Sequence, residues 1–538
     1  MRGIWAPMTL IYLGGPDTIT VLALEENSMW VKHLIALLAQ GARTAYVLYV
    51  TWTFSWYTYL ALVLLFCGII KYGERVWLMR SRAQWKHGDH VQYKETTGHP
   101  NDILSPERPN TALVLRAFSN FRNLNSLSQV DEFKEQYTKW LKGPDSARDI
   151  FKVIEIELGF MYNMLFTKVG TIFAVWGFVI RFINVSCLVF VLAVLIVFEK
   201  PPRFFYNIDF PISVVLLVGG IILEVAGVLM QLVSDRAVVW ANQYHQIKLM
   251  KPIFCLQEHL LSKRKRWAGS MGQLDFVKFY SKPTYGSRGY LLSSFRESGS
   301  NINIVPGLKG LIIGHFRETY PAVKPELGFT TSRGKRTLDN VIIWHIVTEI
   351  FYHREDSKSI EMTMTKTLSN YIMYLLHTCS SSFSSSRTSG EFRGTISAIG
   401  KILEKEKGPI SSTTDAQKQL LEKMLDLPNE PNLIKMLVQS LVKDEIRENK
   451  WDILSNVWVE ILCHAASGWP AEQHAQNLRQ GGEFLTHVWL LLVHLGEVKL
   501  LEVEVSVKLG DIAKAAGREM NIFKDLGTQD SSCFPGIV

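Results

Sequence analysis

The first 233 residues of the chain contain several long apolar runs that are nearly free of charged residues. The run at 52–70 has 19 residues and no charge, and the run at 212–233 has 22 residues with a single acid, Glu224. At about 1.5 Å per helical residue, such runs come close to the roughly 30 Å hydrocarbon thickness of a bilayer. We therefore predict membrane-spanning helices at 34–50, 57–70, 182–198 and 212–233, with a partial span at 4–13.

The charges that flank these runs predict their orientation. Residues 71–86 hold five basic residues against one acid, whereas residues 199–210 hold two of each. Basic flanks of membrane spans face the cytoplasm. We therefore expect the loop at 71–168 and the whole region after Val233 to be cytoplasmic.

Beyond residue 240 the apolar runs are short, as in a water-soluble helical region. Residues 338–353 repeat apolar side chains at helical spacing, which predicts an amphipathic helix with Asp339 as its N-terminal cap. Residues 451–466 and 483–495 also predict helices, and the second is apolar nearly all round but too short to cross a bilayer. The predicted fold class is mainly α: a helical transmembrane bundle followed by a helical cytoplasmic region.

Changes in composition along the chain place the domain boundaries. A run of serines interrupts the helical patterns after Thr378, which is typical of a flexible linker. We predict a transmembrane domain at 1–240, a cytoplasmic helical region at 241–378, a linker at 379–389, a C-terminal helical domain at 390–496 and an atypical tail at 497–538.

Charge and cysteine usage exclude several classes of function. The net charge of +8 is modest for 538 residues, and basic and acidic residues alternate outside the apolar runs, so nucleic-acid binding is not implied. The six cysteines lie far apart without a CxxC pair, unlike a disulfide framework or a zinc ribbon. Phosphate-binding loops and hydrolase motifs are also absent from the sequence. We therefore expect no cofactor.

Glu224 is the sharpest single candidate for function because a carboxylate within an apolar helix costs about 2.5–3.5 kcal/mol on insertion scales. Such groups often face a bundle interior or a water path. Arg181, which precedes a neighbouring span, is a candidate partner if the two residues share the same depth. Glu224 therefore has two interpretations. It is either a relay site for an ion or proton, or a polar group that fixes the packing of the helices.

Histidines and basic residues supply weaker candidates. His345, Glu349 and His353 recur every four residues on one helix face, a pattern that fits either metal ligands or a solvated face. A Cys/His nucleophile pair is conceivable in the C-terminal domain, which contains Cys463, His464, His474, His487 and His494. A further basic run fits either lipid headgroups or a solvated helix end; it consists of Lys263, Arg264, Lys265 and Arg266.

Several strings resemble a family of plant membrane proteins, that of domain of unknown function 4220. They are WAP at 5–7, LGGPDTIT at 13–20, GIIKYGER at 68–75, WHI at 344–346 and LSNY at 368–371. A further string, GEFLTHVW at 482–489, is similar to domain of unknown function 594. The resemblance implies a plant protein with several spans and no assigned function. Because family members usually carry additional spans before WAP, we expect a truncated or alternatively spliced form.

These observations favour an interaction or signalling scaffold in a membrane over an enzyme. Its expected partners are the lipid bilayer and proteins whose identity the sequence does not give. One alternative is a transporter or channel that uses Glu224. The other is a metal-dependent or Cys/His enzyme with its catalytic groups among His464, His474 and His487.

Overall fold

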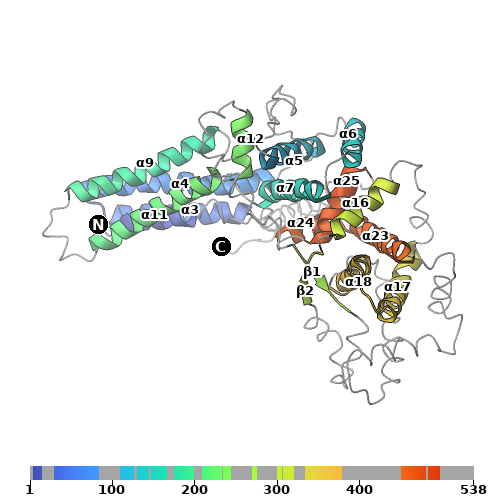
Figure 1. Ribbon diagram of the computed structural model, residues 1–538. Helices are drawn as coiled ribbons and strands as arrows, with labels where there is room; N and C mark the ends of the chain where they lie inside the picture. Colours follow the sequence, from blue (N-terminus) through green and yellow to red (C-terminus); the bar gives the residue numbers. More distant parts are fainter. Residues whose placement is uncertain are drawn as a thin grey trace, which may run out of the picture. The chain divides into compact units, whose positions relative to one another are not determined.

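The computed structural model describes residues 4–14, 30–83, 109–125, 130–143, 147–166, 175–198, 209–232, 234–243, 269–275, 300–305, 307–319, 334–378, 450–479 and 483–496. These ranges contain fifteen helices and one pair of short strands, which confirms the mainly α fold class (Figure 1). The chain divides into two compact units. The first comprises the described residues within 1–126 and 159–264, and the second comprises those within 127–158 and 265–496.

The first unit is built on a bundle of long helices, which lie side by side in Figure 1. They are α3 (Trp30–Val50), α4 (Trp56–Ala83), α9 (Val175–Phe198) and α11 (Asp209–Leu232). Within the described residues, three stretches are helical and apolar enough to cross a membrane: Trp56–Trp77, Val179–Phe198 and Asp209–Leu232. These stretches contain the predicted spans at 57–70 and 182–198 and nearly all of the one at 212–233.

The predicted span at 34–50 forms α3, but this helix is not among the three. Its charged and polar side chains, Lys32, His33, Gln40 and Arg43, lower its mean hydropathy. Its crossing of the membrane therefore stays a prediction.

The predicted partial span at 4–13 forms a short helix, α1 (Trp5–Leu13), packed within this bundle. The Trp5 indole donates to Ser213 Oγ of α11 at 3.0 Å, and the Tyr12 hydroxyl donates to the Leu216 carbonyl at 2.6 Å. On its other side α1 meets α4 at Gly68, where a Cβ atom would lie 3.1 Å from Leu10. Nine residues are too few to cross a bilayer.

The ends of the bundle helices show which termini share a side. The rings of Trp56 and Phe198 lie 5.9 Å apart, so α4 begins where α9 ends. At the opposite end, Arg181 near the start of α9 donates to Gln231 near the end of α11. The C-terminal ends of α4 and α11 and the N-terminal end of α9 therefore lie on the same side of the bundle.

Smaller helices complete the first unit. Helix α5 (Pro109–Asn125) packs against α12 (Asp235–Gln243) and against the end of α7 (Ala147–Phe166). The guanidinium of Arg236 lies 5.7 Å from the ring centroid of Phe118 and 5.8 Å from that of Phe160. Part of the predicted loop at 71–168 is thus helical.

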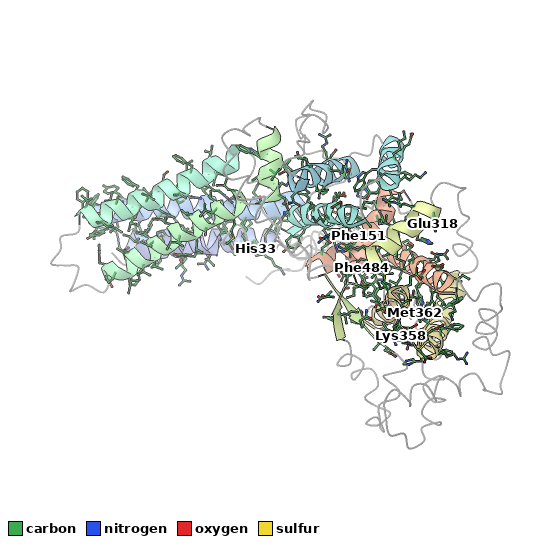
Figure 2. The ribbon with its side chains drawn as sticks, in the orientation of Figure 1. His33, Phe151, Glu318, Lys358, Met362 and Phe484 are labelled. Atoms are coloured by element: carbon green, nitrogen blue, oxygen red, sulfur yellow. The ribbon has the colours of Figure 1, made fainter. Side chains whose placement is uncertain are left out.

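The second unit packs helices around a buried C-terminal helix. It contains α6 (Val130–Lys142), α16 (Leu308–Thr319), α17 (Gly334–Arg354), α18 (Ile360–Thr378), α23 (Lys450–Gly468), α24 (Ala471–Arg479) and α25 (Phe484–His494). Every residue of α25 is buried, as the all-round apolar pattern predicted. Its first ring, Phe484, stacks on Phe151 at 5.8 Å (Figure 2). The predicted linker at 379–389 and tail at 497–538 lie outside the described residues.

The amphipathic helix predicted at 338–353 is present as α17, but the prediction of its cap is wrong. The helix begins at Gly334, so Asp339 lies within it and not at its N-terminus. The predicted stripe is buried at Ile346, Val347 and Ile350. The apolar stripe identified the buried face, whereas the helix extends beyond the stripe into polar sequence.

A two-stranded antiparallel sheet packs against α18. Strand β1 (Ser270–Gln273) pairs with β2 (Ser300–Asn303), with Met271 opposite Ile302. A Cβ atom at Gly272 would lie 2.3 Å from the Tyr374 ring, so only glycine lets the strand approach α18 this closely. This approach brings the residues that follow β1 beside α17 and α18.

Candidate functional site

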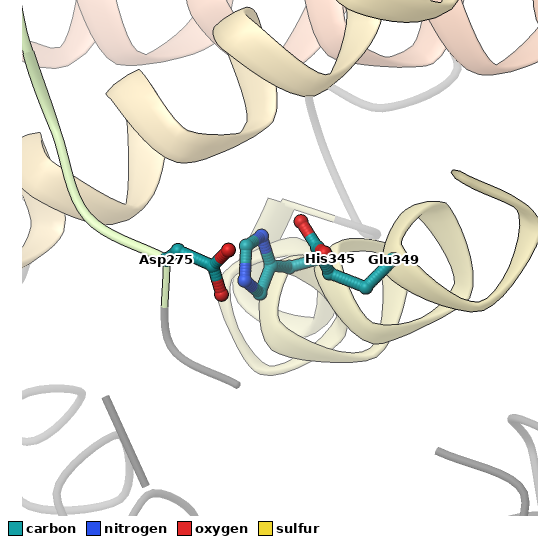
Figure 3. A group of neighbouring side chains, drawn as sticks. All are labelled: Asp275, His345 and Glu349. Atoms are coloured by element: carbon teal, nitrogen blue, oxygen red, sulfur yellow. The ribbon is translucent and has the colours of Figure 1, made fainter. Parts of the chain in front are cut away.

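A group of three potential metal ligands forms where β1 ends beside α17. Asp275 follows the strand, and His345 and Glu349 lie one turn apart on the helix. Figure 3 shows the Asp275 carboxylate facing the His345 ring. One ligand atom from each residue lies within 4.8 Å of the other two. The sequence singled out His345 and Glu349, but it missed Asp275, which is 70 positions away and carries no local signal.

A lysine from α18 already provides a positive charge for this group. Lys366 Nζ lies 2.8 Å from Glu349 Oε2 and 3.5 Å from Asp275 Oδ2. His353, the third predicted ligand, lies 3.4 Å from the same Glu349 oxygen. The ammonium group thus stands where a bound metal ion would neutralise the two carboxylates. We interpret the group as an internal ion network that joins β1, α17 and α18.

Burial and charge set the protonation of this network. Burial raises the pKa of Glu349, but the contact with His353 and the charge of Lys366 outweigh it and bring that pKa to about 2. Burial lowers the pKa of His345, whose Nδ1 lies 2.8 Å from Ser369 Oγ. Glu349 is therefore ionised and His345 neutral at pH 7. Oε1 of Glu349 is buried without a hydrogen-bond partner among the described residues.

Replacing Lys366 with methionine is expected to destabilise the protein by about 3–5 kcal/mol, because two buried carboxylates lose their counter-charge. The same variant should acquire a Zn²⁺ site, since its ligands are then no longer matched by an ammonium group. Thermal unfolding of the parent and of Lys366→Met, with and without Zn²⁺, measures both effects. Zn²⁺ should raise the melting temperature of the single variant Lys366→Met but not that of the parent. The double variant that combines Lys366→Met with Glu349→Gln should not respond to Zn²⁺. Stoichiometric zinc in the parent protein would contradict this interpretation.

The bundle of the first unit contains a second buried charge pair. Glu224 of α11 accepts from Lys71 of α4, and both side chains are largely buried. At Gly14, directly after α1, a Cβ atom would lie 2.8 Å from Lys71 Cγ, so this glycine leaves room for the lysine stem. Lys71 is the first residue of the basic flank at 71–86. The structure instead buries it within the bundle.

Arg181 does not take the partner that the sequence suggested. Its guanidinium donates to Gln231, two turns beyond Glu224 on α11, and both side chains are buried. Helical spacing explains the difference, because seven residues correspond to about 10 Å along the axis. Glu224 and Arg181 therefore each have a partner of their own.

The histidines of the C-terminal helices are buried separately, each with its own partner. His474 lies between Trp469 and Trp489, with Nε2 3.1 Å from the Ala466 carbonyl. His487 lies with Nδ1 3.1 Å from the Glu483 carbonyl, and burial lowers the pKa of each of these two histidines to about 4.

His494 contacts Glu157 and stacks on Tyr137, with the ring centroids 4.4 Å apart. Among the described residues, these histidines do not form a metal-binding group.

Cys463 and His464 have the wrong environment for a nucleophile and its base. Cys463 is buried in α23, and burial raises the pKa of its thiol well above the ordinary value. A thiol of this kind is a poor source of the reactive thiolate. The predicted lipid-binding run at 263–266 lies outside the described residues.

Two protein-family models match this chain. The family model "Domain of unknown function (DUF4220)" matches residues 2–280, more than half of the chain. The chain belongs to the DUF4220 family. A second model, "Protein of unknown function, DUF594", matches residues 443–496. The matches confirm both families and contain the strings at 5–7, 13–20, 68–75 and 482–489, whereas the strings at 344–346 and 368–371 lie in neither match. No curated protein and no solved structure matches this DUF4220 protein.

The two matched regions correspond to different structural features. The DUF4220 match contains the helical bundle with Lys71 and Glu224, and it extends through β1 to Asp275. The DUF594 match contains the buried helices α23, α24 and α25. His345 and Glu349 lie in neither match. The Asp275 network of this DUF4220 protein therefore combines one residue from the family region with others from the segment between the two matches.

Proposed function

We propose that this DUF4220 protein is a multi-pass membrane protein that acts as an interaction or signalling scaffold, with the region after the last span in the cytoplasm. The observation that carries the proposal is the internal matching of buried charge. Glu224 is matched by Lys71 and Glu349 by Lys366, and the buried Glu157 contacts His494. Buried polar groups with fixed partners stabilise one particular packing of the helices.

The same matching weighs against the two alternatives. A conduction path needs a polar group that exchanges partners or faces water at mid-depth, whereas Glu224 is buried against a lysine. Catalysis needs a nucleophile, a base and an orienting group within reach of one another. His464, His474 and His487 do not provide this arrangement.

The proposed orientation rests on the ends of the helices. The C-terminal ends of α4 and α11 share one side of the bundle, so the segments that follow them emerge together. Five of the six charged residues at 71–86 are basic, and four consecutive basic residues follow α11 at 263–266. Even with Lys71 buried, this basic side is expected to face the cytoplasm.

Glycosylation-site mapping tests this topology. An Asn-X-Ser acceptor inserted into the loop at 199–208 should be glycosylated in the secretory pathway, and one inserted at 320–333 should not. The first variant should show a single increase in mass, which treatment with a glycosidase should reverse. A modified acceptor at 320–333 would place the second unit on the opposite side and reject the orientation.

Proximity labelling in cells tests the scaffold function. A labelling enzyme fused to the C-terminus should mark a reproducible set of cytoplasmic proteins. The same enzyme on an unrelated multi-pass protein in the same membrane is the control. The proposal fails if the two sets coincide and the purified protein, reconstituted in vesicles, conducts an ion.

A further inference from the structure

One face of α3 is exposed along the whole helix although the helix belongs to the bundle. Its exposed side chains recur at helical spacing and are mostly apolar or small; they include Val31, Ile35, Leu38, Ala39, Ala42, Tyr46 and Tyr49. On the opposite side Leu34, Leu37 and Leu48 pack against the bundle. Apart from Lys32 near the N-terminal end of the helix, the exposed face resembles the lipid-facing surface of a span, except for one residue.

That residue is Arg43, which is exposed in the middle of this face. No hydrogen bond or ion pair joins its guanidinium to another described residue. In contrast, the buried cations Lys71 and Arg181 of the same bundle both have partners. Within the described part of the chain, Arg43 is thus an unmatched charge on a largely apolar surface.

The packing of α3 on α4 gives the depth of Arg43. The ring of Trp30, at the start of α3, lies 5.1 Å from the guanidinium of Arg80 near the end of α4, and Leu37 shares a core cluster with Tyr72, whereas Leu48 shares one with Leu60. Arg43 lies six residues after Leu37 and five before Leu48. An arginine at such a central depth costs about 2.5–3.5 kcal/mol on insertion scales.

We propose that this face of α3 binds a membrane-spanning helix of another protein, and that a carboxylate on that helix pairs with Arg43. Charge complementarity identifies the partner, because intramembrane charges are generally paired with one another. Ala39 and Ala42, beside Arg43, allow a second helix to approach closely.

A second copy of the chain is a poorer partner. Of the three acids in the described candidate spans, Glu224 is already bound to Lys71, and Glu74 and Asp209 lie near the ends of their stretches, away from the central depth of Arg43. The inference rests on the proposed multi-pass arrangement and is independent of the scaffold role.

Photo-crosslinking in native membranes tests the proposal. A photoreactive amino acid replaces Tyr46, which is 67% exposed and lies one turn beyond Arg43. The crosslinked peptide should come from an apolar helix of another protein and should contain Asp or Glu. Arg43→Leu should lower its yield about three- to thirtyfold, and Arg43→Lys should preserve it. The same photoreactive group at Phe190 of α9, which is 56% exposed, should not capture this peptide.

A synthetic probe tests the charge requirement without the native partner. A 21-residue leucine/alanine helix with one central Glu should bind the full chain in phosphatidylcholine vesicles, measured by energy transfer. The matched Gln helix should bind about three- to thirtyfold more weakly, and Arg43→Leu should abolish this difference.

Three results would overturn the proposal: crosslinks to lipid alone, crosslinks to a second copy, or equal binding of the Glu and Gln helices. Alkaline extraction distinguishes this failure from that of the proposed topology. A chain that resists extraction but fails these assays is embedded in the membrane without the proposed partner.

Discussion

Lowering the pH from about 6.5 to about 4 is expected to unfold the C-terminal helices α24 and α25. Burial lowers the pKa of His474 and of His487 to about 4, whereas an unfolded histidine titrates near 6.5. The unfolded state therefore binds more protons in this range, so the free energy of unfolding decreases as the pH is lowered. Each histidine contributes about 3 kcal/mol that is present above pH 6.5 and lost as the pH approaches 4.

The network at Asp275 extends this acid sensitivity to lower pH. Because the pKa of Glu349 is lowered from 4.5 to about 2, its contribution is present above pH 4.5 and lost between 4.5 and 2. Both effects have the same sign, so acid should unfold α24 and α25 before it disrupts α17.

Hydrogen exchange of the full chain in detergent, followed by mass spectrometry from pH 7.5 to 4, measures this order. In His487→Gln the dependence of stability on pH should weaken by about one proton. The control is Lys139→Gln on the surface of α6, which should leave the profile unchanged. Exchange in α24 and α25 that does not change between pH 7 and 4.5 would contradict the prediction.

Removing either partner of the Lys71–Glu224 pair is expected to destabilise the bundle by about 3–5 kcal/mol, because the other charge stays buried without compensation. Replacing both residues with methionine should recover most of this loss, since apolar side chains of similar volume substitute well for a buried ion pair. The thermal stability of purified Lys71→Met, Glu224→Met and the double variant in detergent forms the test cycle.

The double variant also distinguishes packing from transport. It lacks both titratable groups, so a stable double variant that has lost a flux measured in the parent would support the transporter alternative. Equal stability of parent and single variants would show that the pair is dispensable for packing. Arg80→Gln, at the end of α4 near Trp30, is a control for loss of a basic charge outside the buried pair.

The sequence predicted the features that depend on local spacing. The spans at 57–70 and 182–198 lie wholly within the helices that the structure contains, and the all-round apolar pattern at 483–495 predicted a buried helix correctly. These successes share a cause, because apolar periodicity reports directly on which residues avoid water.

The partners of the candidate residues depend on distant contacts and could not be predicted in this way. Lys71 resembled a cytoplasmic flank because it is the first charge after an apolar run, and only the packing of α1 and α11 shows it to be buried. Asp275 carries no motif, and the three-residue pattern on α17 cannot indicate that Lys366 approaches from another helix. A sequence pattern identifies a helix face, but the neighbour of that face is determined by the tertiary fold.

The separation of Lys71 and Glu224 along the chain has a consequence for biogenesis. The two residues are 153 positions apart. At about 5–20 residues per second, translation leaves Lys71 without its partner for roughly 8–30 s. During this interval an ammonium group within hydrocarbon would be costly, so we expect Lys71 to stay at the membrane surface until α11 inserts. Helix α1, whose hydrogen bonds reach Ser213 and Leu216, waits longer, because 208 and 204 positions separate the bonded residues. Helix α1 therefore reaches its final position only after α11 has been synthesised.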